Sequence, residues 1–323
     1  MRLPWLTRDD KAGQDATVIG FERPYLNETL ALIRRCAALS EAVAPYSREA
    51  FEAAHLGPGA HPQRDIKLLV DGYGVAGLAL FATRGQYRLA RRAFLEVLGF
   101  ERRALEPESV GRLLEAARHD ILADRAPLDS VFVFLDDKTM QREQYVLERL
   151  GFVRERDCLH MTFKAPADYP APRLAHGFRL EPHWIPGHEI EVAERFNAAF
   201  RPPSHIPATP GNFRPLPGDA WLIPDGALFL YERNELAGCV QVLRHFEGTR
   251  PQTFISRLGV VEQYRGRGLG RQLLRAAVQV GRRIGLKEAR LTVYSDTPDA
   301  LHIYESEGFR ERSRVVQLGW QWR

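Results

Sequence analysis

The chain repeats one pattern of elements in its two halves, and this internal repeat limits the folds open to it. The segment FVFLDDKTMQREQYVLERLGFVRER (132–156) can be laid over RLTVYSDTPDALHIYESEGFRER (290–312), with Gly151–Phe152 on Gly308–Phe309. Each copy is typical of a strand, an acidic turn, a short helix that ends at glycine, and a further strand. The matching segments therefore predict two tandem copies of one mixed α/β unit.

A stretch rich in proline and alanine near the middle of the chain marks the boundary between the copies. This stretch is KAPADYPAPRLAHG, residues 164–177 of 323. A chain about twice the length of a typical domain also suits two domains. We expect a first domain over 1–164, a linker over 165–177 and a second domain over 178–323.

Composition argues against several classes of protein. The three cysteines, Cys36, Cys158 and Cys239, are too widely spaced for a disulfide framework, and the ten histidines form no HxxxH or HxH pair, so we expect no metal site. The N-terminus has no apolar signal core, and no run of eighteen apolar residues occurs, so we expect no membrane partner. The three unpaired cysteines suit a reducing cytoplasm, and the 45 basic and 41 acidic residues are too scattered to predict a nucleic-acid partner.

The second copy has the clearer pattern of elements. Its apolar residues predict strands over 227–232, 236–244, 253–261 and 289–294. A helix should begin at 269 and end at Gly285, and its apolar residues recur at three- and four-residue intervals: Leu269, Leu273, Ala277, Val280 and Ile284. A shorter helix that closes before Gly308 and a final strand pair through 317–322 complete this mixed sheet.

The stretch YRGRGLGRQLL, residues 264–274, joins a predicted strand to a predicted helix. The first N–H groups of a helix lack partners and attract anions. Glycines at Gly266, Gly268 and Gly270 allow φ above zero and leave the backbone open to a ligand, and Arg265 and Arg267 add positive charge. This pattern indicates a phosphate-binding nest rather than an ordinary surface turn.

The two familiar nucleotide-binding loops do not fit this stretch. A Walker loop requires GK[ST], and a dinucleotide fingerprint requires glycine where the chain has Arg271. A literal GxGxxG occurs instead at 72–77, but a second strand follows it, so a hairpin is expected there.

The spacing that does fit is Arg-x-x-Gly-x-Gly at Arg265, Gly268 and Gly270, followed by ALHIYESEGF at 300–309. Over about 227–322 the chain resembles the GNAT superfamily of acetyl-CoA-dependent N-acetyltransferases. The resemblance implies that Tyr304 protonates the departing CoA thiolate. It also implies that acetyl-CoA is held by Leu258, Val260, Arg265, Gly266, Arg267, Gly268, Leu269, Gly270, Arg271 and Thr297.

Three features depart from the family pattern. Glu262 stands where proline is frequent, Thr297 stands where asparagine commonly contacts CoA, and the strand 253–261 carries no carboxylate to act as base. The base is therefore unassigned, with Glu247, Asp219 and a water held by Ser256 all open. A CoA-binding regulator without turnover is the alternative to an enzyme.

The acceptor implied by the resemblance is a primary amine of a small molecule or peptide. The segment 201–219 has six prolines in nineteen residues and is expected to cover the acceptor site, where His205, Asn212 and Asp219 offer polar atoms. An ordinary surface loop is the alternative.

The first copy carries the opposite charge at the matching turn. Alignment of Gly111 with Gly270 puts Glu106 and Glu108 at the places of Arg265 and Arg267, and Ser109 at that of Gly268. Pro107 removes a backbone donor, and Leu147 stands at the place of Tyr304. We expect a first domain that keeps the fold without the CoA site, a layout similar to mycothiol synthases and other double-domain GNAT proteins.

Overall fold

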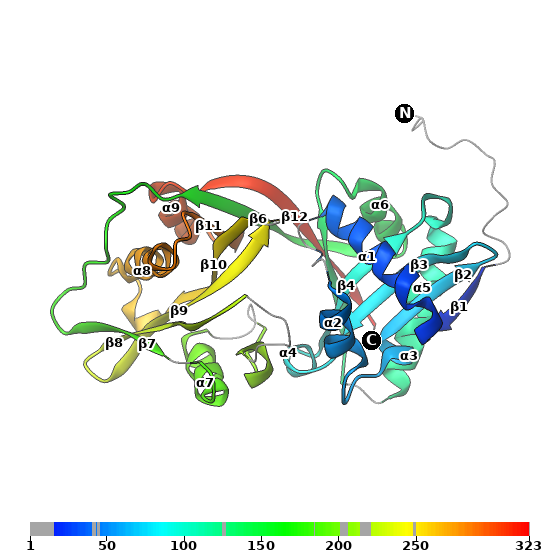
Figure 1. Ribbon diagram of the computed structural model, residues 1–323, viewed down its shortest axis with the longest axis horizontal. Helices are drawn as coiled ribbons and strands as arrows, with labels where there is room; N and C mark the ends of the chain where they lie inside the picture. The colour runs from blue at the N-terminus through cyan, green and yellow to red at the C-terminus, as the bar shows by residue number, and fades with distance from the viewer. Residues whose placement is uncertain are drawn as a thin grey trace. The chain divides into compact units, whose positions relative to one another are not determined.

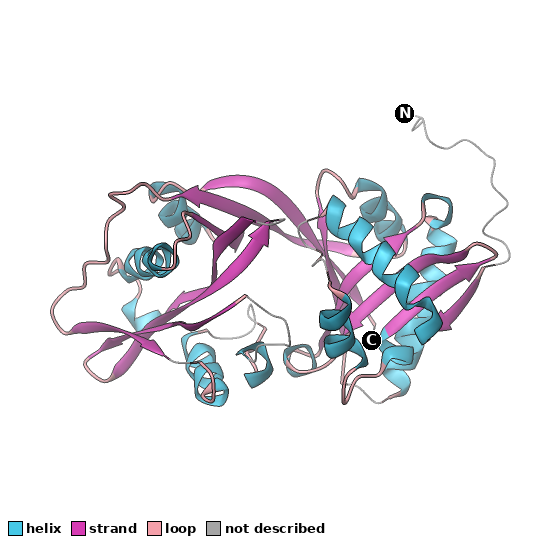
Figure 2. Cartoon of the chain, viewed as in Figure 1, coloured by secondary structure: helices cyan, strands magenta, loops and turns pink. Residues whose placement is uncertain are grey.

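The computed structural model describes residues 16–40, 43, 46–124, 127–183, 185–200, 206–213, 221–247 and 250–322. Two compact units make up the chain, one of Met1–Glu155 with Val316–Arg323 and one of Arg156–Val315 (Figure 1). In each unit, helices cover the faces of a mixed sheet, as Figure 2 shows by colour.

The first unit has the strand order β1-β2-β3-β4-β5-β12. Its strands are β1 (Thr17–Gly20), β2 (Ile66–Asp71), β3 (Gly74–Ala82), β4 (Arg92–Phe100), β5 (Ser130–Asp136) and the later part of β12 (Arg310–Gln321). Its helices are α1 (Leu26–Leu39), α2 (Arg48–Phe51), α3 (Pro62–Asp65), α4 (Gln86–Leu89), α5 (Pro107–Ala123) and α6 (Gln141–Arg149), with short helical turns η2 (Arg23–Tyr25), η3 (Glu52–Leu56) and η4 (Arg102–Ala104).

The second unit has the strand order β6-β11-β10-β9-β8-β7. Its strands are β6 (Val153–Lys164), β7 (Phe178–His183), β8 (Leu222–Glu232), β9 (Glu235–Glu247), β10 (Arg250–Val260) and β11 (Glu288–Tyr294). Its helices are α7 (Glu189–Ala199), α8 (Leu269–Arg283) and α9 (Pro298–Ser306), with turns η5 (Pro210–Phe213) and η6 (Glu262–Tyr264).

Successive residues of β3 enter two different hydrophobic clusters. Leu78 and Leu80 pack in the cluster that includes Ile33 of α1. Ala79 and Phe81 belong to the cluster that includes the apolar residues of α5. Because helices cover both faces, β3 is apolar along almost its whole length, as a strand buried on both sides must be.

The apolar stripe of α8 forms the centre of the second unit. Leu269, Leu273, Ala277 and Val280 are all buried, as the sequence predicts. The expectation for Ile284 was wrong, since its side chain is 41% exposed. The reason is local: α8 ends at Arg283, and Gly285 then takes a φ of 85° that turns the chain away.

The two repeated segments fold alike. Each runs strand, helix, strand, as β5-α6-β6 and as β11-α9-β12. Both short helices are followed by glycine with positive φ, 92° at Gly151 and 98° at Gly308. The turn within 72–77 is a hairpin, because β2 and β3 are antiparallel and Asp71 lies opposite Gly74. The expected final strand pair was wrong: Arg310–Gln321 is one continuous strand.

The last strand of each copy completes a sheet that the other copy begins. Arg156–Lys164 of β6 belongs to the second unit, where it lies antiparallel to Glu288–Tyr294. At the end of the chain, Val316, Leu318 and Trp322 lie in the core of the first unit. The domain ranges 1–164, 165–177 and 178–323 describe the two copies along the sequence and stay a prediction. The packed units differ from these ranges, because each copy contributes its last strand to the sheet of the other.

The exchange predicts that a substitution at the end of the chain weakens the first unit. Leu318→Ala should lower its free energy of unfolding by about 2–5 kcal/mol, because a fully buried leucine leaves a cavity. Hydrogen exchange measured by mass spectrometry should rise in β5 and α5. The control Gln321→Ala, at an exposed position of the same strand, should change little. Faster exchange confined to the second unit would contradict this assignment.

Candidate functional site

The parallel pair β10–β11 is short, and β10 then continues without it. Thr253 to Ile255 pair with Ala289 to Leu291, and no later residue of β10 pairs with β11. On the other side of β10 the register with β9 shifts between Ser256 and Gly259, and Arg257 in this bulge has a φ of 50°. The bulge therefore leaves one edge of β10 free to pair with another extended molecule.

Leu258 and Val260 lie on this free part of β10 and are half-buried. Both contact the hydrophobic cluster below α8 and α9. The apolar pattern of the strand does not predict the bulge, because arginine is not a residue type that favours positive φ.

The turn between β10 and α8 adopts the open backbone that its glycines allow. Gly266 and Gly268 have φ of 75° and 74°, and a Cβ atom at either position would meet no other atom within 4 Å. Gly268 is the N-cap of α8 and supplies no side-chain acceptor to the first turn. The helix therefore begins with N–H groups available to an anion, which is the geometry a pyrophosphate requires.

Gly270 and Leu269 have a packing role. A Cβ at Gly270 would lie 3.4 Å from Cδ1 of Ile303 and 3.9 Å from Cγ2 of Val260. Leu269 is buried in the core below the sheet. The start of α8 thus contacts both β10 and α9, which brings the elements of the predicted site together.

The two arginines of the turn differ in their surroundings. Arg265 is exposed, and its Nε donates to the carbonyl oxygen of Val260 over 3.2 Å. Arg267 donates to Glu232 over 2.7 Å and lies above the ring of Phe178, 4.8 Å from its centroid. Since Glu232 offsets much of the charge of Arg267, Arg265 is the stronger source of positive potential at the turn.

Arg271 connects α8 to the end of α9. Its Nη2 donates to Ser306 Oγ over 3.0 Å, and its Nε lies 3.3 Å from Glu307. Arg275 holds the same carboxylate through two hydrogen bonds of 2.8 and 3.0 Å, and the Tyr169 hydroxyl donates to it over 2.9 Å. Sequence reasoning missed Glu307, whose only signal was its place directly before Gly308, the glycine that ends the helix.

Tyr304 lies on α9 next to Ile303, the residue that contacts Gly270. Its side chain is almost fully buried, and its hydroxyl makes no hydrogen bond within the described ranges. Burial raises the pKa of Tyr304 to about 12. The phenol therefore keeps its proton at neutral pH, which an acid for a leaving thiolate requires.

Thr297 precedes α9 and is exposed. Its hydroxyl donates to the carbonyl oxygen of Tyr294 over 2.6 Å, so it stabilises its own turn. Of the open candidates for the base, Asp219 and the side chain of Glu247 lie outside the described residues, while Ser256 is half-buried on β10.

The proline-rich segment 201–219 is described only over 206–213, so His205 and most of the predicted cover lie outside the described residues. In the described part, Asn212 accepts a hydrogen bond from the N–H of Thr209 over 2.7 Å. Phe213 stacks on Phe196 of α7, with ring centroids 5.5 Å apart. Asn212 thus stabilises the loop itself rather than standing free for a ligand.

The first copy builds the same junction without a nest. Glu106 is the N-cap of α5 with an extended φ of −130°, and Pro107 is its first residue. Glu106 is thus the N-cap of α5, as Gly268 is the N-cap of α8. The connection from β4 to α5 is shorter than that from β10 to α8, and none of its residues has a positive φ. Leu147 does match Tyr304, since each is the seventh residue of its helix.

One group of potential metal ligands is present that the spacing of the histidines does not predict. His183, His188 and Glu191 place one ligand atom each within 4.8 Å of one another. The carboxylate of Glu191 is also paired with Arg195. The group has neither HxxxH nor HxH spacing, because its members stand five and three residues apart, at the end of β7 and the start of α7.

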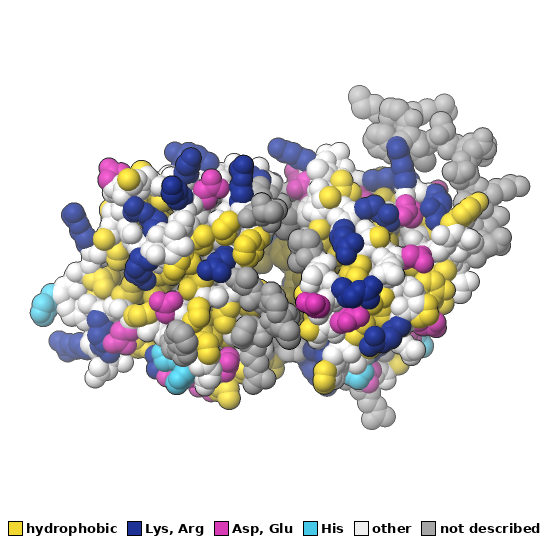
Figure 3. Space-filling view, viewed as in Figure 1, with side chains coloured by type: hydrophobic (Ala, Val, Ile, Leu, Met, Phe, Trp, Pro, Cys, Tyr) yellow, Lys and Arg dark blue, Asp and Glu magenta, His cyan; other side chains and the backbone are white. Residues whose placement is uncertain are grey.

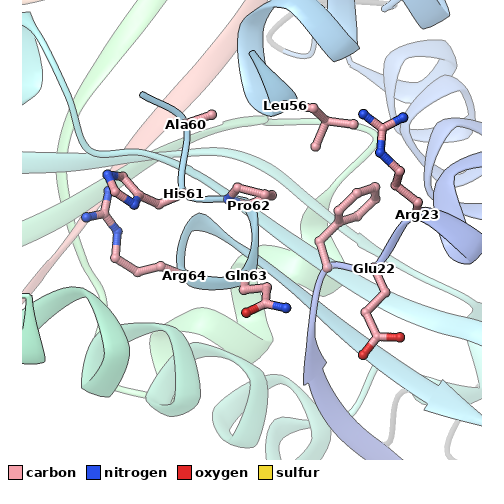
Figure 4. A pocket seen from close by; sticks show the side chains of 9 residues that line it. Glu22, Arg23, Leu56, Ala60, His61, Pro62, Gln63 and Arg64 are labelled. Atoms are coloured by element: carbon pink, nitrogen blue, oxygen red, sulfur yellow. The ribbon is translucent and has the colours of Figure 1, made fainter. Parts of the chain in front are cut away.

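One pocket of the first unit has a volume of about 660 Å³. Figure 4 shows Arg23 on one side of it and His61 with Arg64 on the other. None of the residues predicted to bind CoA lines it. The turn 265–268 that forms the nest is itself exposed.

Charge is distributed broadly over the surface. On the face drawn in Figure 3, dark blue and magenta side chains are interspersed on both units. In the part of the chain that the structure describes, no helix is long and apolar enough to cross a membrane.

Residues 191–309 match the sequence profile of the Acetyltransferase (GNAT) family. A mycothiol acetyltransferase from Saccharomonospora viridis is 31% identical over 180 residues, which are 53% of this chain and 58% of that relative. The match thus spans little more than half of that relative's length. A mycothiol acetyltransferase from Geodermatophilus obscurus is 27% identical over 300 residues, 90% of this chain and 92% of the relative.

Two solved structures share the fold over almost the whole chain. A GCN5-related N-acetyltransferase from Sphaerobacter thermophilus has a TM-score of 0.69 and 19% identity, and the match covers 95% of this chain and 96% of that one. A tandem GNAT protein from the clavulanic acid biosynthesis pathway has a TM-score of 0.68 and 14% identity, with 96% and 99% covered. The tandem α/β layout predicted from the repeat is thereby confirmed.

The environment of Tyr304 predicts a specific loss of stability in alkali. The folded protein keeps the Tyr304 proton up to about pH 12, whereas an unfolded tyrosine loses it near pH 10. Stability that is present below pH 10 should therefore be lost between these values. Tyr304→Phe should lose less in this window, by up to roughly 2–3 kcal/mol in urea unfolding. Identical alkaline profiles would show that Tyr304 ionises freely in the folded protein.

Proposed function

We propose that this chain, a tandem member of the GNAT acetyltransferase family, transfers an acetyl group from acetyl-CoA to a primary amine of a small molecule or peptide at a site in its second unit. One observation carries the proposal: the open nest of Gly266 and Gly268 follows directly on the unpaired edge of β10. An anion-binding turn and a free strand edge, in sequence, suit a ligand with a pyrophosphate at one end and an extended amide arm.

The residues present fit acetyl-CoA in their chemistry. The N–H groups of Arg265 to Arg271 would take the pyrophosphate, and Arg265 would add charge beside it. The edge of β10 at Leu258 and Val260 would pair with the pantetheine amides. Arg271 would act less directly, because Ser306 and Glu307 already hold its guanidinium.

Tyr304 would supply the acid in the transfer step. The amine nitrogen attacks the thioester carbonyl carbon, a C–N bond forms, and the tetrahedral intermediate carries an oxyanion. When the C–S bond breaks, the hydroxyl of Tyr304 gives its proton to the leaving thiolate. The proton that the amine loses restores the phenol by way of solvent, since β10 carries no carboxylate to take it.

The absence of a carboxylate on β10 favours one other function. A chain that binds acetyl-CoA without turnover would use the same nest and would need no base. An assay of CoA release with pooled amines separates the two. Because the relatives are named for mycothiol, the pool should include amines related to mycothiol as well as aminoglycosides, amino acids and peptides.

The nest predicts one acetyl-CoA per chain and a sharp contrast between two glycines that flank α8. Gly268 and Gly285 both have positive φ and open space around them, so alanine at either should cost about 1–2 kcal/mol in stability. Only Gly268→Ala should also weaken acetyl-CoA binding, by roughly tenfold or more. Calorimetry should give a stoichiometry near one. Two equivalent sites, or equal affinities for both variants, would contradict the nest.

The acid role predicts that Tyr304→Phe lowers kcat by roughly ten- to a thousandfold while the affinity for acetyl-CoA changes little. Tyr231→Phe is a matched control, because Tyr231 is a buried tyrosine of β8 that bonds to Arg195. This control should keep its kcat. If Tyr304→Phe turns over normally at saturating substrate, the tyrosine serves only the core, and acetyl transfer by the second unit is then still testable through the nest.

A further inference from the structure

The first unit contains a second, smaller cavity, with a volume of about 210 Å³. This is enough space for several water molecules or a small organic ligand. Its polar lining comes from Tyr46, His55, Asp65, Thr83, Arg84 and Glu96.

Glu96 reaches this cavity from a bulge in β4. Leu80 pairs with Val97 and Phe81 pairs with Leu95, so Glu96 is an extra residue without a partner on β3. The parallel pairing of β4 with β5 ends just before, at Phe94. The strand therefore brings a carboxylate to the point where the sheet of the first unit separates.

The carboxylate of Glu96 lacks a counter-charge. Its one hydrogen-bond partner among the described residues is the hydroxyl of Tyr46. Burial raises the pKa of Glu96. The cation nearest in the lining, Arg84, is already bonded to the carbonyl oxygens of Gly59 and Ala54 over 2.6 and 3.1 Å. Without a counter-charge the raised pKa favours the neutral acid, and a cationic ligand in the cavity would supply the partner that stabilises the carboxylate.

The other acid of the lining is already satisfied. Asp65 accepts hydrogen bonds from Arg64 over 2.8 and 2.9 Å and from Thr83 over 3.0 Å. Glu96 is thus the acidic group of this cavity that has no cationic partner among the described residues.

His55 adds a polar atom without a partner. Its Nε2 is buried and makes no hydrogen bond to the residues that the structure describes. Its ring packs edge-on against Tyr46, with centroids 5.2 Å apart. Burial, and then the charge of Arg84, lower the pKa of His55 to about 4, so the imidazole is neutral at pH 7 and can accept a hydrogen bond.

We propose that this cavity binds a small primary ammonium ion, which Glu96 and Tyr46 hold and His55 contacts. An ammonium group has three donors, and the carboxylate, the phenolic oxygen and the imidazole nitrogen are three acceptors around one space. The inference uses no residue of the proposed transferase site. It gives the first copy a binding role of its own after loss of the nest.

Calorimetry on the full chain with propylammonium chloride at constant ionic strength tests this site. We expect roughly millimolar affinity for the wild type. Glu96→Gln keeps the shape of the side chain and should weaken binding at least tenfold, or about 1.4 kcal/mol. Glu143→Gln is the control, because Glu143 is a half-buried carboxylate of α6 outside the cavity, and it should bind as the wild type does.

Propanol and propionate have the same chain length without the positive charge and should not bind. If Glu96→Gln does not fold, His55→Phe provides the comparison and should weaken binding about threefold or more. The proposal is overturned if wild type shows no binding up to about 50 mM, if propanol binds as well, or if the folded variants retain full affinity. Retained affinity would assign the amine to another site, including the transferase site.

Discussion

Beyond Ile255 the backbone of β10 no longer pairs with β11. On the opposite side of the strand, a bulge at Arg257 shifts its register against β9. Close packing on both sides fixes the bulged strand. A Cβ at Gly259 would strike the ring of Phe200 at 2.5 Å, and one at Gly238 would lie 2.7 Å from the carbonyl oxygen of Gly259. The free edge and the direction in which the chain enters the nest both follow from this geometry, so the glycines of the strands support the site as much as those of the turn do.

The same separation of strands occurs in both units, but the two copies use it differently. In the second, a longer connection with two positive-φ glycines leads into α8. In the first, a shorter connection leads through Glu106 and Pro107 into α5, and the bulge carries Glu96 into a cavity. The split sheet therefore does not require the glycine turn, because the split occurs within the strands while the turn lies in the longer connection.

Much of this could be predicted from local pattern. The repeat, the stripe of α8 and the strands of the second copy follow from periodicity and glycine punctuation, and the fold shared with a tandem GNAT protein confirms the layout they imply. The bulges at Arg257 and Glu96 could not be predicted, because register depends on packing across strands rather than on residue type. The contact of Glu307 with Arg271 and the exposure of Ile284 likewise depend on where neighbouring helices end. The roles assigned to the nest and to Tyr304 stay predictions.

The exchange of terminal strands has a consequence for synthesis on the ribosome. The first unit includes Val316, Leu318 and Trp322, which are translated long after the rest of its sheet. Its remaining strands therefore wait, with the edge of β5 uncovered, while the whole second copy emerges. An uncovered edge invites pairing with other chains. The second unit is contiguous over Arg156–Val315 and has all its strands before the last residues emerge, so the first unit is the one whose sheet is completed last.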